Sequence, residues 1–341
     1  MSGFVSLAVA VASTWLVSRN AERLGLIDVP NDRSLHQRIT PRGGGLGIIL
    51  GVAGGLWVLN VLGGEPSRQL DILLAGTGAI ALLGVVDDRH PLPARLRLAA
   101  HFLVAAAVVA ALGGVERLPL PHPLDLSLGL LGSPFAVLWI VTVTNFFNFM
   151  DGLDGLAGGQ AVASCVGVIV ATWSTDALQG AALMAAATIG FLVWNRPPAR
   201  IFLGDAGSTS LGFAIACFPL LASTANRPAT VFAVGVGLSL FLLDPLETLF
   251  RLARRGHRIG RPHRAHSYQL LAWARQRHGP VAGSLIASGM VLSIAGAIAY
   301  RVPAAAWPAA LLAVAIYSVE RYLAGRARLQ AATILNAGSE T

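Results

Sequence analysis

The chain has 341 residues, of which 55% are hydrophobic and only 12% are charged, whereas a soluble globular domain carries about 25% charged residues. The mean hydropathy is +0.65, and the formal net charge is +8. All 25 basic residues are arginines, and they lie in the gaps between apolar runs. This distribution excludes an ordinary soluble domain and does not fit a nucleic-acid-binding protein, whose basic residues gather on one folded face.

Apolar runs of about 17–22 residues recur along nearly the whole chain, and each is long enough to cross a bilayer as a helix. They predict an all-α polytopic membrane protein whose residues 1–341 form a single integral membrane domain. We expect about eleven transmembrane helices, at residues 2–18, 44–62, 70–86, 98–114, 133–150, 157–174, 178–194, 207–224, 229–250, 280–300 and 303–320. No basic segment precedes the first run, which favours a retained helix over a cleaved signal peptide. Cys165 and Cys217 fall inside apolar runs and are expected to be packing residues.

The positions of the arginines predict the orientation of these helices. If the segment 19–43 is cytoplasmic and the following segments alternate, the cytoplasmic segments hold 21 of the 25 arginines. The four arginines of the outer segments are Arg68, Arg117, Arg227 and Arg301. Because arginine is enriched in cytoplasmic loops, this asymmetry places the N-terminus outside and the C-terminus in the cytoplasm.

The dense polar segments all fall on the predicted cytoplasmic side. They are residues 28–45, 87–97, 148–155, 195–208 and 254–269. A transporter, the main alternative that is not an enzyme, concentrates its polar groups near the bilayer midplane. Asp244 and Glu247 come closest to that pattern, yet they too lie in the cytoplasmic half of a span. The pattern therefore favours an enzyme with its active site on the cytoplasmic face.

Five aspartates lie at predicted helix ends on this face. They are Asp87, Asp88, Asp151, Asp154 and Asp205. Mg²⁺ prefers oxygen ligands and is usually held by one or two carboxylates together with substrate phosphates. A single aspartate at such a place is as often a helix N-cap, but five beside Gly or Asn favour a metal and phosphate site. The spacing of Asp151 and Asp154 would place both on one helix face if the preceding helix continued.

The last cytoplasmic loop carries the sequence RPHRAH, in which His263 and His266 alternate with Arg261 and Arg264. Histidine pairs bind Zn²⁺ in many proteins, but the interleaved arginines would repel a cation. Arginine binds phosphate oxygens in a bidentate manner, so this loop is better suited to hold phosphates. Together with the carboxylates, it predicts phosphoryl chemistry on a lipid-linked phosphate at the membrane face.

In their order along the chain, these segments resemble the polyprenyl-phosphate N-acetylhexosamine-1-phosphate transferases. The resemblance runs from Asp28 to Gln269, most of the chain, and rests on five motifs: DVPNDRSLH…PRGGG, DDRH, NFFNFMDGLDGLAGG, NRPPARIFLGDAGS and RPHRAHSYQ. The form of the last motif resembles the branch of the family that initiates O-antigen chains.

The resemblance implies a Mg²⁺-dependent reaction. A UDP-N-acetylhexosamine gives its sugar-1-phosphate to undecaprenyl phosphate, UMP leaves, and the product is a lipid-linked diphosphate sugar. This product would initiate O-antigen or lipopolysaccharide-type synthesis at the bacterial cytoplasmic (inner) membrane. A homodimer is compatible with the resemblance, and no nucleic acid is expected as a partner.

The resemblance also suggests residue roles by position. Asp205 resembles the family's metal ligand, and Asp87 resembles the residue proposed to activate the acceptor phosphate, with Asp88 supporting the metal or the phosphates. His263 and His266 resemble its diphosphate-binding histidines. The substrate-binding residues implied around the nucleotide are Asn148, Asp151, Asp154, Asn195 and Phe202. The candidate phosphate clamps are Arg89, Arg95, Arg97, Arg261 and Arg264.

Two departures from the family's pattern leave some roles open. His90 and Pro91 occupy the region where many relatives have a further Asp, and RPHRAH stands where several have a His-x-His-His run. The individual roles of the histidines therefore stay open. The competing enzyme class, the Mg²⁺-dependent membrane prenyltransferases, uses repeated Asp-x-x-x-Asp patterns on helices, which this sequence lacks.

The protonation state of the acceptor phosphate bears on the role of Asp87. A phosphate monoester has a second pKa near ~6, so at neutral pH most of it is already a dianion. A carboxylate with a pKa near ~4 would be a poor base for it. We therefore expect Asp87 to position the phosphate or the metal rather than to act as a general base.

Overall fold

The computed structural model describes residues 1–30, 38–62, 67–171, 174–256, 266–275 and 278–338. Its α-helices are α1 (Ser2–Leu24), α2 (Gly45–Val61), α3 (Arg68–Arg89), α4 (Ala94–Leu112), α5 (Gly132–Phe149), α6 (Leu156–Ala171), α7 (Thr175–Asn195), α8 (Asp205–Cys217), α9 (Arg227–Gly237), α10 (Ser239–Arg254), α11 (Ser267–Arg275), α12 (His278–Arg301) and α13 (Ala306–Gly338). Short 3₁₀ turns are η1 (Gly129–Leu131), η2 (Phe218–Leu221), η3 (Thr224–Asn226) and η4 (Pro303–Ala305). Two antiparallel strands, β1 (Ile27–Asp28) and β2 (Thr40–Pro41), pair before α2.

Most of these helices are long and apolar enough to cross a bilayer. Within the described residues seven helices meet that description, and α9 with α10 would make an eighth if the bent pair is one span. Three shorter apolar helices, α2, α6 and α8 with η2, accompany them. The architecture is therefore that of an all-α polytopic membrane protein, with the small β1–β2 sheet added. That all eleven predicted runs cross the membrane stays a prediction.

Each predicted run coincides with a helix, but three details differ from the prediction. The run 229–250 is broken at Leu238, where the axes of α9 and α10 differ by 73°. An apolar run carries no signal for such a bend. The helix α5 ends at Phe149, so Asp151 and Asp154 lie in a connection, where Gly155 has a left-handed φ of +76°. The helix α11 was not predicted.

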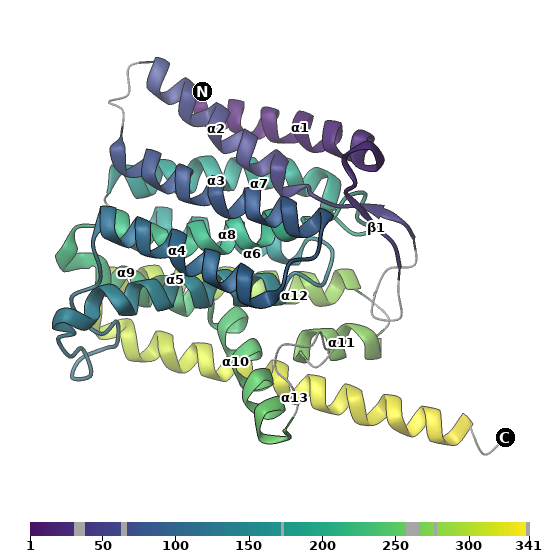
Figure 1. The fold of residues 1–341 in the computed structure, drawn as a ribbon. Coiled ribbons are helices and arrows are strands. Elements are labelled where there is room, and N and C mark those ends of the chain that lie inside the picture. Colours follow the sequence, from purple (N-terminus) through teal and green to yellow (C-terminus); the bar gives the residue numbers. More distant parts are fainter. Residues whose placement is uncertain (31–37, 63–66, 172–173, 257–265, 276–277, 339–341) are drawn as a thin grey trace.

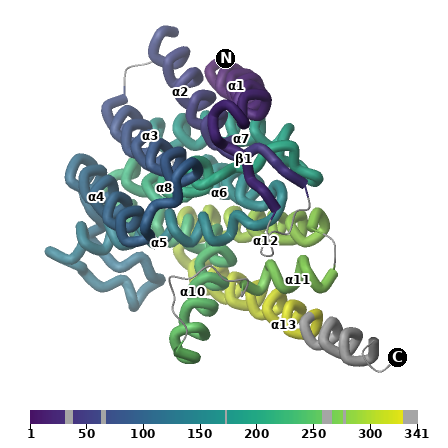
Figure 2. The backbone as a smooth tube through the Cα atoms, turned by 45° about the vertical axis from the view of Figure 1, so that its right-hand side comes forward, coloured from purple at the N-terminus to yellow at the C-terminus, as the bar shows by residue number. Residues whose placement is uncertain are grey.

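The helix α8 lies inside the bundle, and the other helices surround it. It packs between α3 and α5, while α1, α2 and α7 pack together on one side and α6, α9 and α12 on the other (Figures 1 and 2). Every residue of α8 after Asp205 is buried. Its hydroxyl groups are satisfied within the helix, because Ser208, Thr209 and Ser210 donate to carbonyls one turn back.

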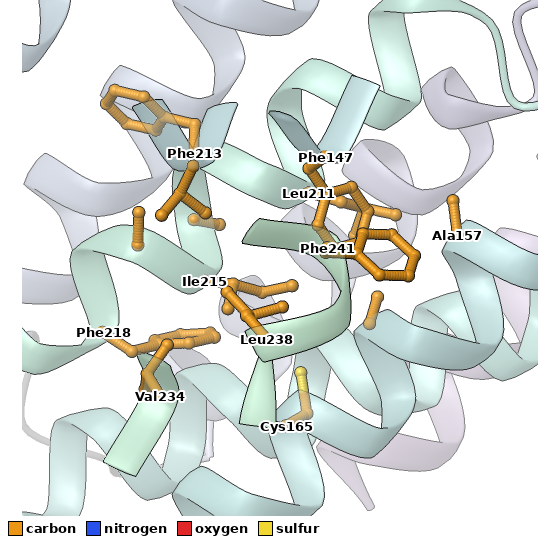
Figure 3. Packing of buried hydrophobic residues seen from close by; sticks show 14 of the residues in the cluster. Phe147, Ala157, Cys165, Leu211, Phe213, Ile215, Phe218, Val234, Leu238 and Phe241 are labelled. Atoms are coloured by element: carbon orange, nitrogen blue, oxygen red, sulfur yellow. The ribbon is translucent and has the colours of Figure 1, made fainter. Parts of the chain in front are cut away.

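Aromatic and branched side chains fill the space between α8 and its neighbours (Figure 3). Phe147 of α5 packs against Phe241 of α10 with ring centroids 5.0 Å apart. Phe213 and Phe218, from α8 and η2, are fully buried. Because close-packed interiors transmit displacements rather than absorb them, this packing fixes the position of α8 relative to α3 and α5.

Two polar segments far apart in the sequence are joined beside the start of α8. The Gly44 amide donates to the Phe202 carbonyl at 2.9 Å, and the Phe202 amide donates to the Pro41 carbonyl at 2.8 Å. The Gly45 amide donates to the Leu203 carbonyl at 3.0 Å. The predicted polar segments 28–45 and 195–208 therefore meet at the end of the bundle where α3 ends and α4 begins.

Candidate active site

Glycines allow α3 and α2 to approach the first turn of α8 closely. A Cβ on Gly84 of α3 would lie only 2.4 Å from the Ala206 amide nitrogen. A Cβ on Gly45 would lie 2.1 Å from the Cα of Gly207. Such contacts are closer than any side chain permits, so glycine at these positions brings the last turn of α3 against the N-terminus of α8.

Asp88 caps α8 from the neighbouring helix. Its two carboxylate oxygens accept from the backbone amides of Asp205 at 3.2 Å and Ala206 at 3.3 Å. The first amides of a helix lack partners within the helix and favour negative charge. Gly204 makes room for this contact with a φ of +73°, and Arg42 donates to the Asp88 backbone carbonyl. Asp88 thus positions α8, and its assignment to the metal stays a prediction.

Asp87 and Asp205 are held together by one arginine. Arg97 Nη1 lies 2.5 Å from Asp87 Oδ2 and 3.2 Å from Asp205 Oδ2. The other Asp87 oxygen accepts from the Leu92 amide at 2.6 Å. Asp87 lies in the last turn of α3 and Arg97 in the first turn of α4. The carboxylate and its counter-ion therefore come from consecutive helices joined by a short connection.

Asn148 connects the end of α5 to the same carboxylate. Its amide nitrogen donates to Asp205 Oδ1 at 3.0 Å and to Ser208 Oγ at 2.8 Å. One carboxylate oxygen of Asp205 therefore accepts from Asn148, and the other accepts from Arg97. The structure thus brings three motifs of the sequence to one point: the paired aspartates, the NFFNFMDGLDG segment and the FLGDAGS segment.

Asp151 adds a further carboxyl group close to this cluster. Burial and the charges of Asp205, Asp88 and Asp154 raise the pKa of the Asp151 carboxyl from 3.8 to about 8. Burial is the larger cause, and the repulsion of the neighbouring carboxylates adds to it. A cation placed among them would relieve this repulsion.

Two of the residues expected around the nucleotide, Asp154 and Asn195, form hydrogen bonds with the backbone of two connecting segments. Asp154 Oδ2 accepts from the Ala199 amide at 2.9 Å. Asn195 is 6% exposed; its side chain accepts from the Gly155 amide and donates to the Ile201 carbonyl. These bonds hold residues 150–155 against residues 196–203. Their direct contact with a nucleotide stays a prediction, as does that of Phe202, which is half-buried.

Of the predicted histidines and clamps, His266, Arg89, Arg95 and Arg97 lie in the described part of the chain, and Arg95 is exposed. His266 is 3% exposed, and its Nδ1 lies 3.3 Å from Asp244 Oδ1. Asp244 also accepts from the Ser267 and Tyr268 amides, which fixes the start of α11. The Arg89 side chain donates to the Leu24 carbonyl at 2.7 Å. Arg261, His263 and Arg264 lie outside the described residues.

The oxygen ligands at this site suit a hard cation. Among the described residues, no group of three or more Asp, Glu, His or Cys side chains is arranged to hold a metal. Mg²⁺ does not need such a cage, because it is usually bound by one or two carboxylates together with substrate phosphates and water. Asp205 and Asp87, which share Arg97, supply carboxylates of this kind.

Comparison with known proteins identifies the family of this chain. The family model of glycosyl transferase family 4 matches residues 70–223, which include the Asp87–Asp205 cluster. A probable undecaprenyl-phosphate N-acetylglucosaminyl 1-phosphate transferase of Bacillus subtilis is 31% identical over 274 residues, covering 78% of this chain and 75% of that protein. The chain belongs to this family, the polyprenyl-phosphate hexosamine-1-phosphate transferases.

Less similar relatives match a comparable share of the chain. An undecaprenyl-phosphate alpha-N-acetylglucosaminyl 1-phosphate transferase of Yersinia pestis is 27% identical, covering 77% of this chain and 73% of its own. A decaprenyl-phosphate N-acetylglucosaminephosphotransferase of Mycobacterium tuberculosis is 28% identical, covering 81% and 76%. The resemblance drawn from the five motifs is confirmed at the level of the family.

Some residues of this glycosyl transferase family 4 site were not predicted from the sequence. Arg42 contacts Asp88 from the segment before α2, and Asp244 anchors the start of α11. His101 and Asn145 line the same cavity as Asp87 and Asp205. The helical spacing of Arg97 and His101 was the available signal for His101, since residues four apart share a helix face.

Proposed function

We propose that this protein transfers N-acetylhexosamine-1-phosphate from a UDP-sugar to undecaprenyl phosphate and releases UMP. The observation that carries the proposal is the Asp87–Arg97–Asp205 cluster at the α3–α8 contact, in a chain of this family. In the reaction an oxygen of the lipid phosphate forms a bond to the β-phosphorus of the UDP-sugar. The bond between that phosphorus and the bridging oxygen breaks, and UMP leaves with the electron pair.

Both reactants are anions, so positioning and charge neutralisation dominate the catalysis we infer. The positively charged side chain of Arg97 contacts both Asp87 and Asp205. It would hold the phosphates close to these carboxylates. Asn148 orients Asp205 through the bond to Oδ1. Leu92 and Arg97 each donate to an oxygen of Asp87, which leaves that carboxylate a weaker base and supports a positioning role.

Mg²⁺ is the cofactor we propose. It would be held by Asp205, with Asp87 or Asp88 and the substrate phosphates, and would neutralise the diphosphate and the leaving UMP. The carboxylates of Asp87 and Asp205, held together by Arg97, are the support for this assignment. Asp154 and Asn195 would then keep the 150–155 and 196–203 segments in the shape that receives the uridine.

The remaining details of the proposal follow the resemblance. The donor is a UDP-N-acetylhexosamine, and the relatives' names make UDP-N-acetylglucosamine the first donor to test. The site lies on the cytoplasmic face of the bacterial inner membrane, which the arginine distribution supports. The product would initiate an O-antigen or related envelope polysaccharide, and the protein could act as a homodimer.

A UMP-release assay tests the proposal directly. Purified protein is incubated with undecaprenyl phosphate, Mg²⁺ and a panel of UDP-N-acetylhexosamines, and UMP is measured. We expect UMP with at least one donor, dependent on both lipid and Mg²⁺. The Asp205→Asn variant is expected to lose at least about 10²-fold in rate. Absence of UMP with every donor would overturn the transferase proposal.

A further inference from the structure

A polar cavity between α3, α4, α5 and α8 contains one histidine that the proposed function has not used. The wall of this cavity includes Asp87, Arg97, Asn148, Asp205 and His101. His101 is 4% exposed and lies outside the motifs that carry the family resemblance. A polar side chain buried at this point needs a reason, because buried polar groups are normally hydrogen-bonded.

The contacts of Asn145 fix which nitrogen of His101 carries the proton. The Asn145 side-chain nitrogen lies 2.7 Å from the Val141 carbonyl oxygen. Since that oxygen only accepts, the Asn145 group facing it is the NH₂. The same nitrogen lies 3.3 Å from His101 Nδ1 and donates its second hydrogen there. Nδ1 is therefore an acceptor, so the imidazole is neutral and carries its hydrogen on Nε2.

Within the part of the chain that the structure describes, the Nε2–H group is then a donor without a protein acceptor. Among the described residues, the contact with Asn145 through Nδ1 is the hydrogen bond that His101 makes. The ring lines the cavity that also holds Arg97 and both reactive carboxylates. An almost fully buried donor beside an arginine is suited to an anionic oxygen, such as that of a phosphate.

The depth of His101 indicates which phosphate it would meet. It lies one helical turn further along α4 than Arg97, and Asn145 lies about one turn before Asn148 on α5. One turn is about 5.4 Å along the helix, so both residues lie deeper in the bundle than the Arg97–Asp205 contact. The phosphate of a polyprenyl lipid reaches the site from the bilayer, whereas a nucleotide arrives from the aqueous side.

We propose that His101 Nε2–H donates a hydrogen bond to the phosphate of the polyprenyl acceptor, and that Asn145 positions the imidazole by fixing its tautomer. The inference rests on the proposed transferase function and adds two residues to its acceptor site. His101 contacts the substrate in this arrangement, and Asn145 acts through His101.

Variants that differ in the position of one donor test this assignment. Glutamine carries its amide nitrogen the same number of bonds from Cα as imidazole Nε2, whereas asparagine carries it at the position of Nδ1. Binding of undecaprenyl phosphate without donor is followed by the rise in the midpoint of thermal unfolding. We expect His101→Leu and His101→Asn to weaken acceptor binding roughly 10- to 100-fold, and His101→Gln to stay within about threefold of wild type.

Three further measurements make the result specific. UDP-sugar binding should be unchanged in all His101 variants, which also shows that they are folded. The control His122→Leu changes an exposed histidine in the connection between α4 and α5 and should bind both substrates normally. Asn145→Leu should weaken acceptor binding in the wild-type background but add little to His101→Leu, because the two residues act as one unit.

Several outcomes would overturn the inference. They are normal acceptor binding in His101→Leu, equal weakening in His101→Gln and His101→Leu, and a loss of UDP-sugar binding as large as the loss of acceptor binding. The last outcome would move the contact to the donor diphosphate. Failure of the transferase proposal would be recognised separately, as absence of UMP from the wild-type protein with every donor.

Discussion

Asp87 and Asp88 are neighbours in the sequence, yet their carboxylates have different partners. Asp88 accepts hydrogen bonds from two backbone amides of α8 and so caps that helix. Asp87 faces the cavity and shares Arg97 with Asp205. Consecutive residues of a helix point about 100° apart, so a paired motif can place one carboxylate on the framework and the other in the site.

The Asp87→Asn variant separates a positioning role from a basic one. If Asp87 only positions the acceptor, the variant should lose at least about tenfold in rate, and by a similar factor at about pH 6 and about pH 8.5. UMP release at saturating UDP-sugar is the measurement, with wild type assayed in parallel at both pH values. A variant that is inactive at the lower pH but recovers most of its activity at the higher pH would establish Asp87 as the base.

The raised pKa of Asp151 predicts how the metal-free protein responds to pH. A carboxyl whose pKa rises from 3.8 to about 8 binds its proton more tightly in the folded than in the unfolded state. The stability from this group is complete below about pH 4 and is lost as the pH rises through about 8. We expect the thermal midpoint without divalent cations to fall between about pH 5 and about pH 8.5, and the fall to be smaller in Asp151→Asn. Identical slopes in the two proteins would contradict this.

At the scale of single residues, the sequence was more informative about location than about contact. It predicted that the segments carrying Asp87, Asn148 and Asp205 lie on one face of the membrane, because run length and helix ends suffice for that. It did not reveal that Asp154 and Asn195 bond to the backbone of the opposite segment. Side chains of Asp and Asn are equally suited to ligands and to backbone amides, so residue type alone does not separate the two uses.

At the scale of elements, the close contact of α3 with α8 determines the distance between the reactive carboxylates. A Cβ on Gly84 would lie 2.4 Å from the Ala206 nitrogen and 2.6 Å from the Asp205 carbonyl carbon. Both are backbone atoms, so Gly84→Ala must push α3 away from α8 and move Asp87 relative to Asp205. Because a misplacement of about 1 Å costs about 10²-fold in rate, we expect a loss of that size in UMP release.

The same helix supplies the control. A Cβ on Gly78 would meet no atom within 4 Å, so Gly78→Ala makes the same chemical change in α3 without moving it. We expect Gly78→Ala to keep wild-type activity, with both variants inserted in the membrane to similar levels. Equal activity of the two variants would show that the α3–α8 distance does not control the reaction.

The bend between α9 and α10 shows what an apolar pattern cannot predict. Residues 229–250 read as one span because hydropathy is continuous across Leu238. The turn depends instead on tertiary contacts, since Gly237 lies against Ser293 of α12 and a Cβ there would be 2.7 Å from Ser293 Oγ. The α5 end is similar, because Gly152 and Gly155 permit the chain to turn but do not require it.

At the scale of the whole molecule, helix order and charge distribution agree. Three of the polar segments predicted to share one face, residues 87–97, 148–155 and 195–208, come together where α3, α5 and α7 end and α4, α6 and α8 begin. Two predicted spans lie between successive polar segments, so the chain returns to the same end at each of them. The sequence could predict this arrangement since it depends on run length and alternation, which are local properties.

The side of the membrane on which this end lies is open to a direct test. Cys165 and Cys217 are fully buried, so the wild-type protein should react weakly with a membrane-impermeant maleimide. Glu116→Cys, in the exposed connection between α4 and α5, and His90→Cys, in the exposed connection between α3 and α4, place one thiol beyond each end of α4. In intact spheroplasts we expect labelling of Glu116→Cys alone, and of His90→Cys only after permeabilisation. The reverse pattern would place the carboxylate cluster outside the cell, away from the cytoplasmic UDP-sugars, and would refute both the orientation and the proposed donor.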